Sequence, residues 1–142
     1  MFNKVIWATD GSEHADRALE VARSVVSANG GSLLGVHSVE YLIGAGSKGA
    51  PTKLADEDSR EEKIRQQLEA VASDGVPAEM KIVAAGASGA AHTVAKVAEE
   101  EKADLIVVGS RGHTPLAGLL LGSVTQRLLA IAPCPVLVVP TR

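Results

Sequence analysis

Short apolar runs alternate with helix-like patterns along this chain. Continuous apolar runs of this length are typical of strands buried on both faces of a sheet. The predicted strands span residues 4–8, 32–39, 78–83, 104–109 and 135–140. The third of them alternates the charged residues Glu79 and Lys81 with apolar ones, which is the pattern of an edge strand with one face in water.

The segments between these strands repeat apolar residues at helical spacing. The predicted helices lie between residues 12 and 29, and over 56–73, 88–100 and 123–132. The predicted inward face of the second helix consists of Ile64, Leu68, Val71 and Ala72. Residues 44–53 hold three glycines and a proline without periodicity, so we predict a loop there.

This alternation predicts an α/β fold with one doubly wound, five-stranded parallel sheet and helices on both faces. Right-handed crossovers and an outer third strand give the strand order 3-2-1-4-5. With 142 residues, 46% of them hydrophobic, residues 1–142 are expected to form a single domain. Such sheets bind ligands beyond the carboxyl ends of the strands, where the strand order reverses. Asp10 and Gly109 stand at those ends, on strands one and four.

A glycine pattern follows the fourth predicted strand. Two residues separate Gly109 from Gly112, and nine more precede Gly122 and Ser123, where the last helix begins. Glycines let a backbone approach a ligand closely, and a helix start offers unpaired N–H groups to phosphate. The Ser123 hydroxyl can either cap that helix or donate to a phosphate oxygen. The pattern predicts a phosphate site, and a tight loop without a ligand is the alternative.

Composition disfavours several kinds of partner. The net charge of −3 and the presence of only three aromatic residues argue against nucleic acid, which calls for a basic surface and stacking side chains. No run reaches the roughly 18 apolar residues of a membrane span, so no membrane partner is expected. Cys134 is the only cysteine, so no internal disulfide forms and packing is favoured over redox chemistry. The expected location is the cytoplasm.

Over essentially its whole length, the chain resembles the universal stress protein family of the single-domain type. Stretches typical of the family are residues 8–12, His37, 103–109 and 134–139. The glycine pattern also meets the family's nucleotide signature, Gly-2x-Gly-9x-Gly-Ser/Thr. Family members with the intact signature bind ATP. The resemblance therefore implies an ATP-binding protein that acts as a nucleotide-dependent sensor or regulator in a stress response.

The resemblance also implies a role for each matching residue. Thr9 and Asp10 are expected beside the ribose and phosphates, and Val108 and the backbone of Ser38 beside the adenine. The residues expected to cradle the phosphates are Gly109, Gly112, Gly122, Ser123 and Val124. Ser38 departs from the family's pattern, in which we expect an apolar residue, and this puts the fit around the base in question. The family commonly pairs its last strands, so a homodimer through the C-terminal strand is expected.

The charge of the ligand adds a prediction about metal. ATP carries about four negative charges, whereas the glycine loop supplies only Arg111 and His113 as cations, so Mg²⁺ is expected with the nucleotide, held largely through water. Asp10 can hold one of those waters, or it can merely cap the first helix. Arg111 can clamp a phosphate or remain in solvent.

Other features favour plainer interpretations. Residues 44–49 match GxGxxG but open no helix, so we interpret them as a surface loop that can at most cover the site. His37 is interpreted as a structural hydrogen-bonding residue. No nucleophile with an oriented base is visible, so we assign no catalytic residue and expect at most weak ATP hydrolysis. The alternatives are a slow ATPase or nucleotidyl transferase, a binder of AMP or a cyclic nucleotide, and an interaction protein with an empty site.

Overall fold

The computed structural model describes residues 1–43, 51–53, 56–112 and 121–141. The elements of this part of the chain are, in order, β1 (Lys4–Ala8), α1 (Glu13–Asn29), β2 (Ser32–Val39), β3 (Tyr41–Ile43), β4 (Pro51–Lys53), α2 (Glu57–Ser73), β5 (Ala78–Ala84), α3 (Ala90–Glu100), β6 (Leu105–Gly109), α4 (Ser123–Ile131) and β7 (Val136–Val139). None of the helices described here has the length and apolar character that crossing a membrane requires.

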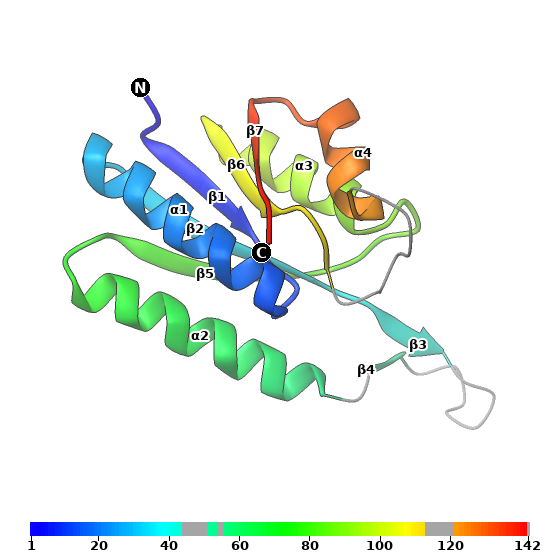
Figure 1. Ribbon diagram of the computed structural model, residues 1–142. Helices are drawn as coiled ribbons and strands as arrows, with labels where there is room; N and C mark the ends of the chain where they lie inside the picture. The colour runs from blue at the N-terminus through cyan, green and yellow to red at the C-terminus, as the bar shows by residue number, and fades with distance from the viewer. Residues whose placement is uncertain (44–50, 54–55, 113–120, 142) are drawn as a thin grey trace.

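Five strands form one parallel sheet in the order β5-β2-β1-β6-β7. This confirms the predicted order 3-2-1-4-5, because β5, β6 and β7 are the third, fourth and fifth predicted strands. The predicted edge strand, β5, lies at one edge of the sheet, and β1 lies in its middle. Helices α1 and α2 cover one face, and α3 and α4 cover the other (Figure 1).

Alternate residues of β1 serve the two halves of the core. Val5 and Trp7 pack with α1 and α2, whereas Ile6 and Ala8 pack with α3 and α4. Trp7 is fully buried, and its indole N–H donates to the backbone oxygen of Ala15 in α1 at 2.9 Å. A strand that is apolar on both faces is stable only between two covered faces, which places β1 in the centre.

The buried face of α2 differs from the prediction. Its buried residues are Glu57, Glu61, Ile64, Leu68 and Val71. These positions recur every three or four residues, so they form one stripe along the helix. The prediction that Ala72 faces inward is wrong: it is exposed, because it lies next to the stripe and not on it.

A small second sheet was not predicted. Strands β3 and β4 pair antiparallel, with Tyr41 opposite Lys53 and Ile43 opposite Pro51, and the pair projects beyond the carboxyl end of β2 (Figure 1). The predicted loop is therefore wrong for Pro51–Lys53, whereas residues 44–50, with the GxGxxG match, lie outside the described residues. Three residues are too few to show an alternating pattern, and a proline fits a strand only at its start or at an edge, as here.

Candidate functional site

A pocket of about 240 Å³ opens at the carboxyl ends of β1, β2 and β6. The strand order reverses at this place, so it is where a doubly wound sheet binds its ligands. The residues assigned to the site from the sequence all line it: Thr9, Asp10, Ser38, Val108, Gly109, Arg111, Gly112, Gly122, Ser123 and Val124. The structure brings these residues together, and their contacts with a ligand remain predictions.

The turn after β1 holds Asp10 at the pocket wall. The backbone N–H of Ser12 donates to Asp10 Oδ1 at 3.0 Å, and the N–H of Gly11 donates to the Thr9 hydroxyl at 3.0 Å. Ser12 caps α1, because its side chain accepts from the N–H of Ala15. The alternative that Asp10 merely caps this helix is therefore wrong, and its carboxylate lines the pocket.

The glycines of the predicted phosphate site serve different purposes. A Cβ on Gly109 would lie 2.7 Å from the backbone oxygen of His14, so this glycine lets β6 pack against α1. A Cβ on Gly112 would lie 2.5 Å from Asp10 Oδ2, so this glycine makes room for the carboxylate. A Cβ on Gly122 would meet only ordinary contacts at 3.4 Å and beyond. Packing within the protein therefore explains Gly109 and Gly112 but not Gly122.

Helix α4 begins at the pocket without a side-chain cap. Its N-cap is Gly122, and no side chain of the described residues caps it. The alternative that Ser123 caps the helix is wrong, since Ser123 is its first residue and is exposed on the pocket wall. The hydroxyl of Thr125 donates to the backbone oxygen of Gly109 at 2.8 Å and ties the first turn of α4 to β6. Such a helix start, with its N–H groups and positive dipole end, suits an anion.

The edge of β2 is open beside the pocket. Strand β1 pairs with β2 only as far as Ala8 opposite Val36, and the N–H of Thr9 donates to the backbone oxygen of Val36 at 3.0 Å. Among the described residues, β2 continues beyond Val36 with β5 alone as its paired strand. In a parallel strand the N–H and C=O groups of alternate residues point to opposite edges, so those of Ser38 point to the side where β1 has ended. Ser38 thus presents a backbone donor and an acceptor at the pocket.

His37 and Glu57 form a buried pair at the pocket wall, with exposures of only 2% and 3%. His37 Nδ1 lies 2.9 Å from the backbone oxygen of Thr9, and Nε2 lies 2.9 Å and 3.1 Å from the two Glu57 oxygens. A carbonyl only accepts, so Nδ1 carries a hydrogen, and one further proton lies between Nε2 and the carboxylate. These contacts agree with a structural role for His37. Sequence analysis missed Glu57, and its place in the buried stripe of α2 was the signal for it.

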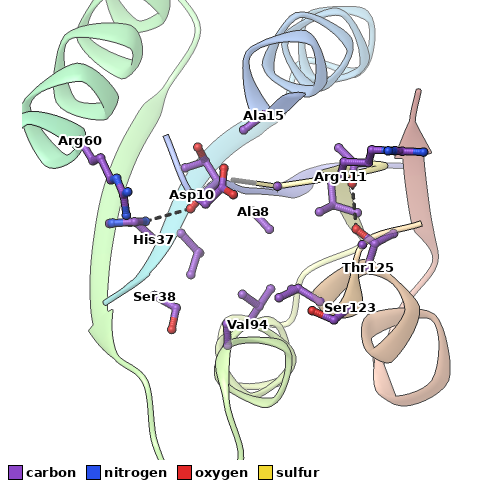
Figure 2. Close-up of a pocket in the computed structure, with 18 of the residues that line it drawn as sticks. Ala8, Asp10, Ala15, His37, Ser38, Arg60, Val94, Arg111, Ser123 and Thr125 are labelled. Carbon is purple, nitrogen blue, oxygen red and sulfur yellow. Dashed lines mark hydrogen bonds between the residues drawn. The ribbon is translucent and has the colours of Figure 1, made fainter. Parts of the chain in front are cut away.

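Arg60 of α2 also lines the pocket and was missed. Its side chain reaches the pocket wall beside His37, whereas that of Arg111 points the other way, away from Ser38 (Figure 2). Arg60 supplies a cation that was not counted, because only the cations of the glycine loop were considered. It was missed because nothing in the sequence near Arg60 indicates that α2 lies at this pocket. His113, the other cation expected there, lies outside the described residues.

The pocket offers oxygen donors for a metal but no complete metal site. Within the described residues, no group of three His, Cys, Asp or Glu side chains is placed to hold a metal ion. The Asp10 carboxylate lies beside the glycine pattern, because its Oδ2 occupies the space next to Gly112. A single carboxylate fits an ion such as Mg²⁺, which keeps most of its waters and binds phosphate oxygens.

Cys134 takes no part in the pocket. Its side chain packs against the half of the core formed with α3 and α4. Burial, and then the nearby Asp104 carboxylate, raise the pKa of the Cys134 thiol above its ordinary value. The thiol therefore stays protonated, which agrees with packing and disfavours redox chemistry.

Comparison with known proteins adds independent information. Residues 1–140 match the universal stress protein family. A universal stress protein of Thermus aquaticus is 42% identical over 143 residues, with 98% of this chain and 99% of the relative covered. Universal stress protein YxiE of Bacillus subtilis is 34% identical over 150 residues, with the same coverage of 98% and 99%.

Solved structures agree. Protein MJ0577 of Methanocaldococcus jannaschii matches with a TM-score of 0.76 at 27% identity, over 100% of this chain and 98% of that one. A universal stress protein in complex with cAMP matches with a TM-score of 0.71 at 25% identity, over 99% of this chain and 98% of that one. By sequence and by fold, this chain belongs to the universal stress protein family.

Proposed function

We propose that this protein binds ATP in the pocket and acts as a nucleotide-dependent sensor or regulator in a stress response. In this proposal it works in the cytoplasm as one nucleotide-binding domain (1–142), pairs into a homodimer through β7, and passes its nucleotide state to a regulatory protein partner. The site binds nucleotide and turns it over weakly at most.

The observation that carries the proposal is the pairing of two features in one pocket. The open edge of β2 at Ser38 offers a donor and an acceptor side by side, which suits the hydrogen-bonding edge of a base. The uncapped start of α4 at Gly122 offers N–H groups, which suit phosphate. Since both features line the same pocket, a nucleotide is the ligand whose two ends match them.

Each part of the nucleotide meets its own group of residues in this proposal. The base lies against Val108, with its polar edge at the Ser38 backbone. The ribose lies near Thr9 and Asp10. The phosphates lie at Gly109, Arg111, Gly112, Gly122, Ser123 and Val124.

Mg²⁺ accompanies the ATP. The carboxylates of Asp10, Glu40 and Glu57 line the pocket together with the cations Arg60 and Arg111, so the protein alone leaves most of the roughly four negative charges of ATP uncompensated. The ion would bind the phosphate oxygens and keep most of its waters, with Asp10 accepting a hydrogen bond from one of them.

AMP or a cyclic nucleotide is the second candidate ligand. The observation that favours it is the universal stress protein in complex with cAMP, which is 25% identical to this chain and shares its fold. Such a ligand would use the same strand edge and place its single phosphate at the start of α4.

Calorimetric titration of the protein, stripped of bound nucleotide, with ATP and Mg²⁺ tests the proposal. We expect micromolar affinity, reduced by excess chelator. Gly122→Val should weaken binding at least about tenfold, because it fills the pocket wall at a position where a Cβ meets only ordinary protein contacts. The matched control is Gly86→Val, since Gly86 lies outside the pocket and a Cβ there meets nothing within 4 Å.

The outcomes separate the candidates. Tighter binding of AMP or cyclic AMP than of ATP favours the second ligand. Steady ATP turnover that is lost in Gly122→Val favours a slow enzyme. Absence of binding for all these nucleotides contradicts the proposal and favours an interaction protein with an empty site.

A further inference from the structure

A hydroxyl group on the pocket wall has no hydrogen-bond partner. Ser38 Oγ is shielded from solvent, and no described residue provides a partner for it. Other hydroxyls of this region are paired: that of Thr9 accepts from Gly11, and that of Thr125 donates to Gly109. A buried hydroxyl without a partner destabilises the folded state, so this exception calls for an explanation.

The surroundings of Ser38 are apolar. Ser38 shares one face of β2 with Leu34 and Val36, which pack with α3 and α4. Ser38 lies on the Val94 side of the pocket, opposite Arg60 (Figure 2). Apolar side chains beside a hydroxyl suit a flat heteroaromatic ring, because the side chains pack on the ring and the hydroxyl meets one of its nitrogens.

The hydroxyl can reach the pocket without movement of the backbone. Ser38 as a whole is only half-buried and lines the pocket, although its oxygen is shielded. A serine side chain has three staggered positions, and rotation about its Cα–Cβ bond moves the oxygen among them. A hydroxyl both donates and accepts, so it can pair with a ring nitrogen or with an exocyclic amino group.

We propose that the Ser38 side chain is a specificity group for the nucleobase: its hydroxyl, which no described residue engages, hydrogen-bonds the base when nucleotide is bound. The inference rests on the proposed function and adds to it, since contact through the Ser38 backbone does not require a serine.

The inference predicts that Ser38→Ala weakens binding without destabilising the fold. The ligand-free variant should unfold at about the same temperature as the wild type, because no described residue hydrogen-bonds the hydroxyl. Its affinity for AMP and for ATP should fall about 3- to 10-fold, because the base loses one hydrogen bond. Thr93→Val is the matched control, since its hydroxyl is outside the pocket and already donates to the backbone oxygen of Gly89 at 3.0 Å. That variant should gain no stability and bind nucleotide as the wild type does.

Two ligands that differ in the presence of the base show whether the loss of affinity in Ser38→Ala depends on the base. Scanning calorimetry and titration are carried out on wild type and Ser38→Ala with AMP and with ribose 5-phosphate, which lacks the base. The expected result is weaker binding of AMP and unchanged binding of ribose 5-phosphate. Equal AMP affinities, or an equal loss for both ligands, overturns the inference alone. Failure of the wild type to bind any nucleotide overturns the proposed function and the inference together.

Discussion

At the scale of single residues, the His37 imidazole joins three elements behind the pocket. His37 of β2 donates through Nδ1 to the backbone oxygen of Thr9, and its Nε2 faces the carboxylate of Glu57 at the start of α2. The pair therefore fixes the position of α2 relative to the turn that contains Asp10. Because both side chains are buried, either one without the other leaves a polar atom unpaired.

Substitution of Glu57 tests this arrangement. Glu57→Leu should lower the free energy of unfolding by about 1–3 kcal/mol, because Nε2 of His37 then lacks a partner in a site closed to water. Glu57→Gln should cost less, since an amide N–H can donate to Nε2 of a neutral imidazole while Nδ1 still donates to Thr9. Urea denaturation at neutral pH measures both. Glu69→Leu, an exposed position on the same helix, should change stability by less than about 0.5 kcal/mol. Equal losses of stability in Glu57→Leu and Glu57→Gln would contradict a stabilising hydrogen bond between residue 57 and Nε2 of His37.

At the scale of elements, the sequence predicts what has a long or local pattern. Most strands of the main sheet have apolar runs, β5 has an alternating pattern, and the glycine spacing is visible within one segment, so all of these could be predicted. The β3–β4 pair could not be predicted, because strands of three residues show no periodicity and β4 begins with Pro51. The predicted inward face of α2 omitted Glu57 and Glu61, although both continue its stripe at helical spacing and are buried in the structure.

The two glycines that follow β6 should respond differently to the same substitution. Gly109→Ala should lower the free energy of unfolding by about 1–3 kcal/mol, because its Cβ would press on the backbone of α1 at His14 O, which cannot easily move. Gly112→Ala presses on the flexible Asp10 carboxylate, so it should change stability by less than about 0.5 kcal/mol yet weaken Mg²⁺-dependent ATP binding. Denaturation and calorimetric titration of both variants provide the comparison. A stable Gly109→Ala protein, or a Gly112→Ala protein with normal Mg²⁺-dependent binding, would contradict these roles.

At the scale of the whole molecule, strand order creates the pocket. Asp10, Ser38 and Gly109 are distant in the sequence and meet because β2, β1 and β6 are neighbours. Rules of connection and handedness predict that order, so the place of the pocket was predictable from the sequence. The presence of Arg60 in the pocket was not predictable, because it depends on where α2 packs. The Ser38 hydroxyl without a partner among the described residues was not predictable either, because it depends on which groups surround it in the fold.

Strand β7 gives the sheet an outer edge that is suited to a second copy of the chain. The backbone oxygen of Pro135 accepts from Ile106 in β6, and that of Val139 accepts from Ser110 just after β6. By alternation, the backbone polar groups of Val136 and Val138 therefore point outward. Leu137 in the same strand is 38% exposed. An apolar strand edge of this kind is a template for pairing with another strand, which supports the proposed homodimer.

A charge exchange at Leu137 tests that homodimer. In antiparallel pairing of β7 about a two-fold axis, a residue in the middle of the strand lies near its own copy. Leu137→Lys or Leu137→Glu alone should therefore give monomers by like-charge repulsion, whereas a mixture of the two variants should form dimers again. Ile82→Lys is the matched control, because Ile82 is 36% exposed on β5 at the opposite edge of the sheet, and it should leave the dimer intact. Sedimentation equilibrium measures the mass of each sample. A monomeric wild type, or a mixture that stays monomeric, would contradict pairing through β7.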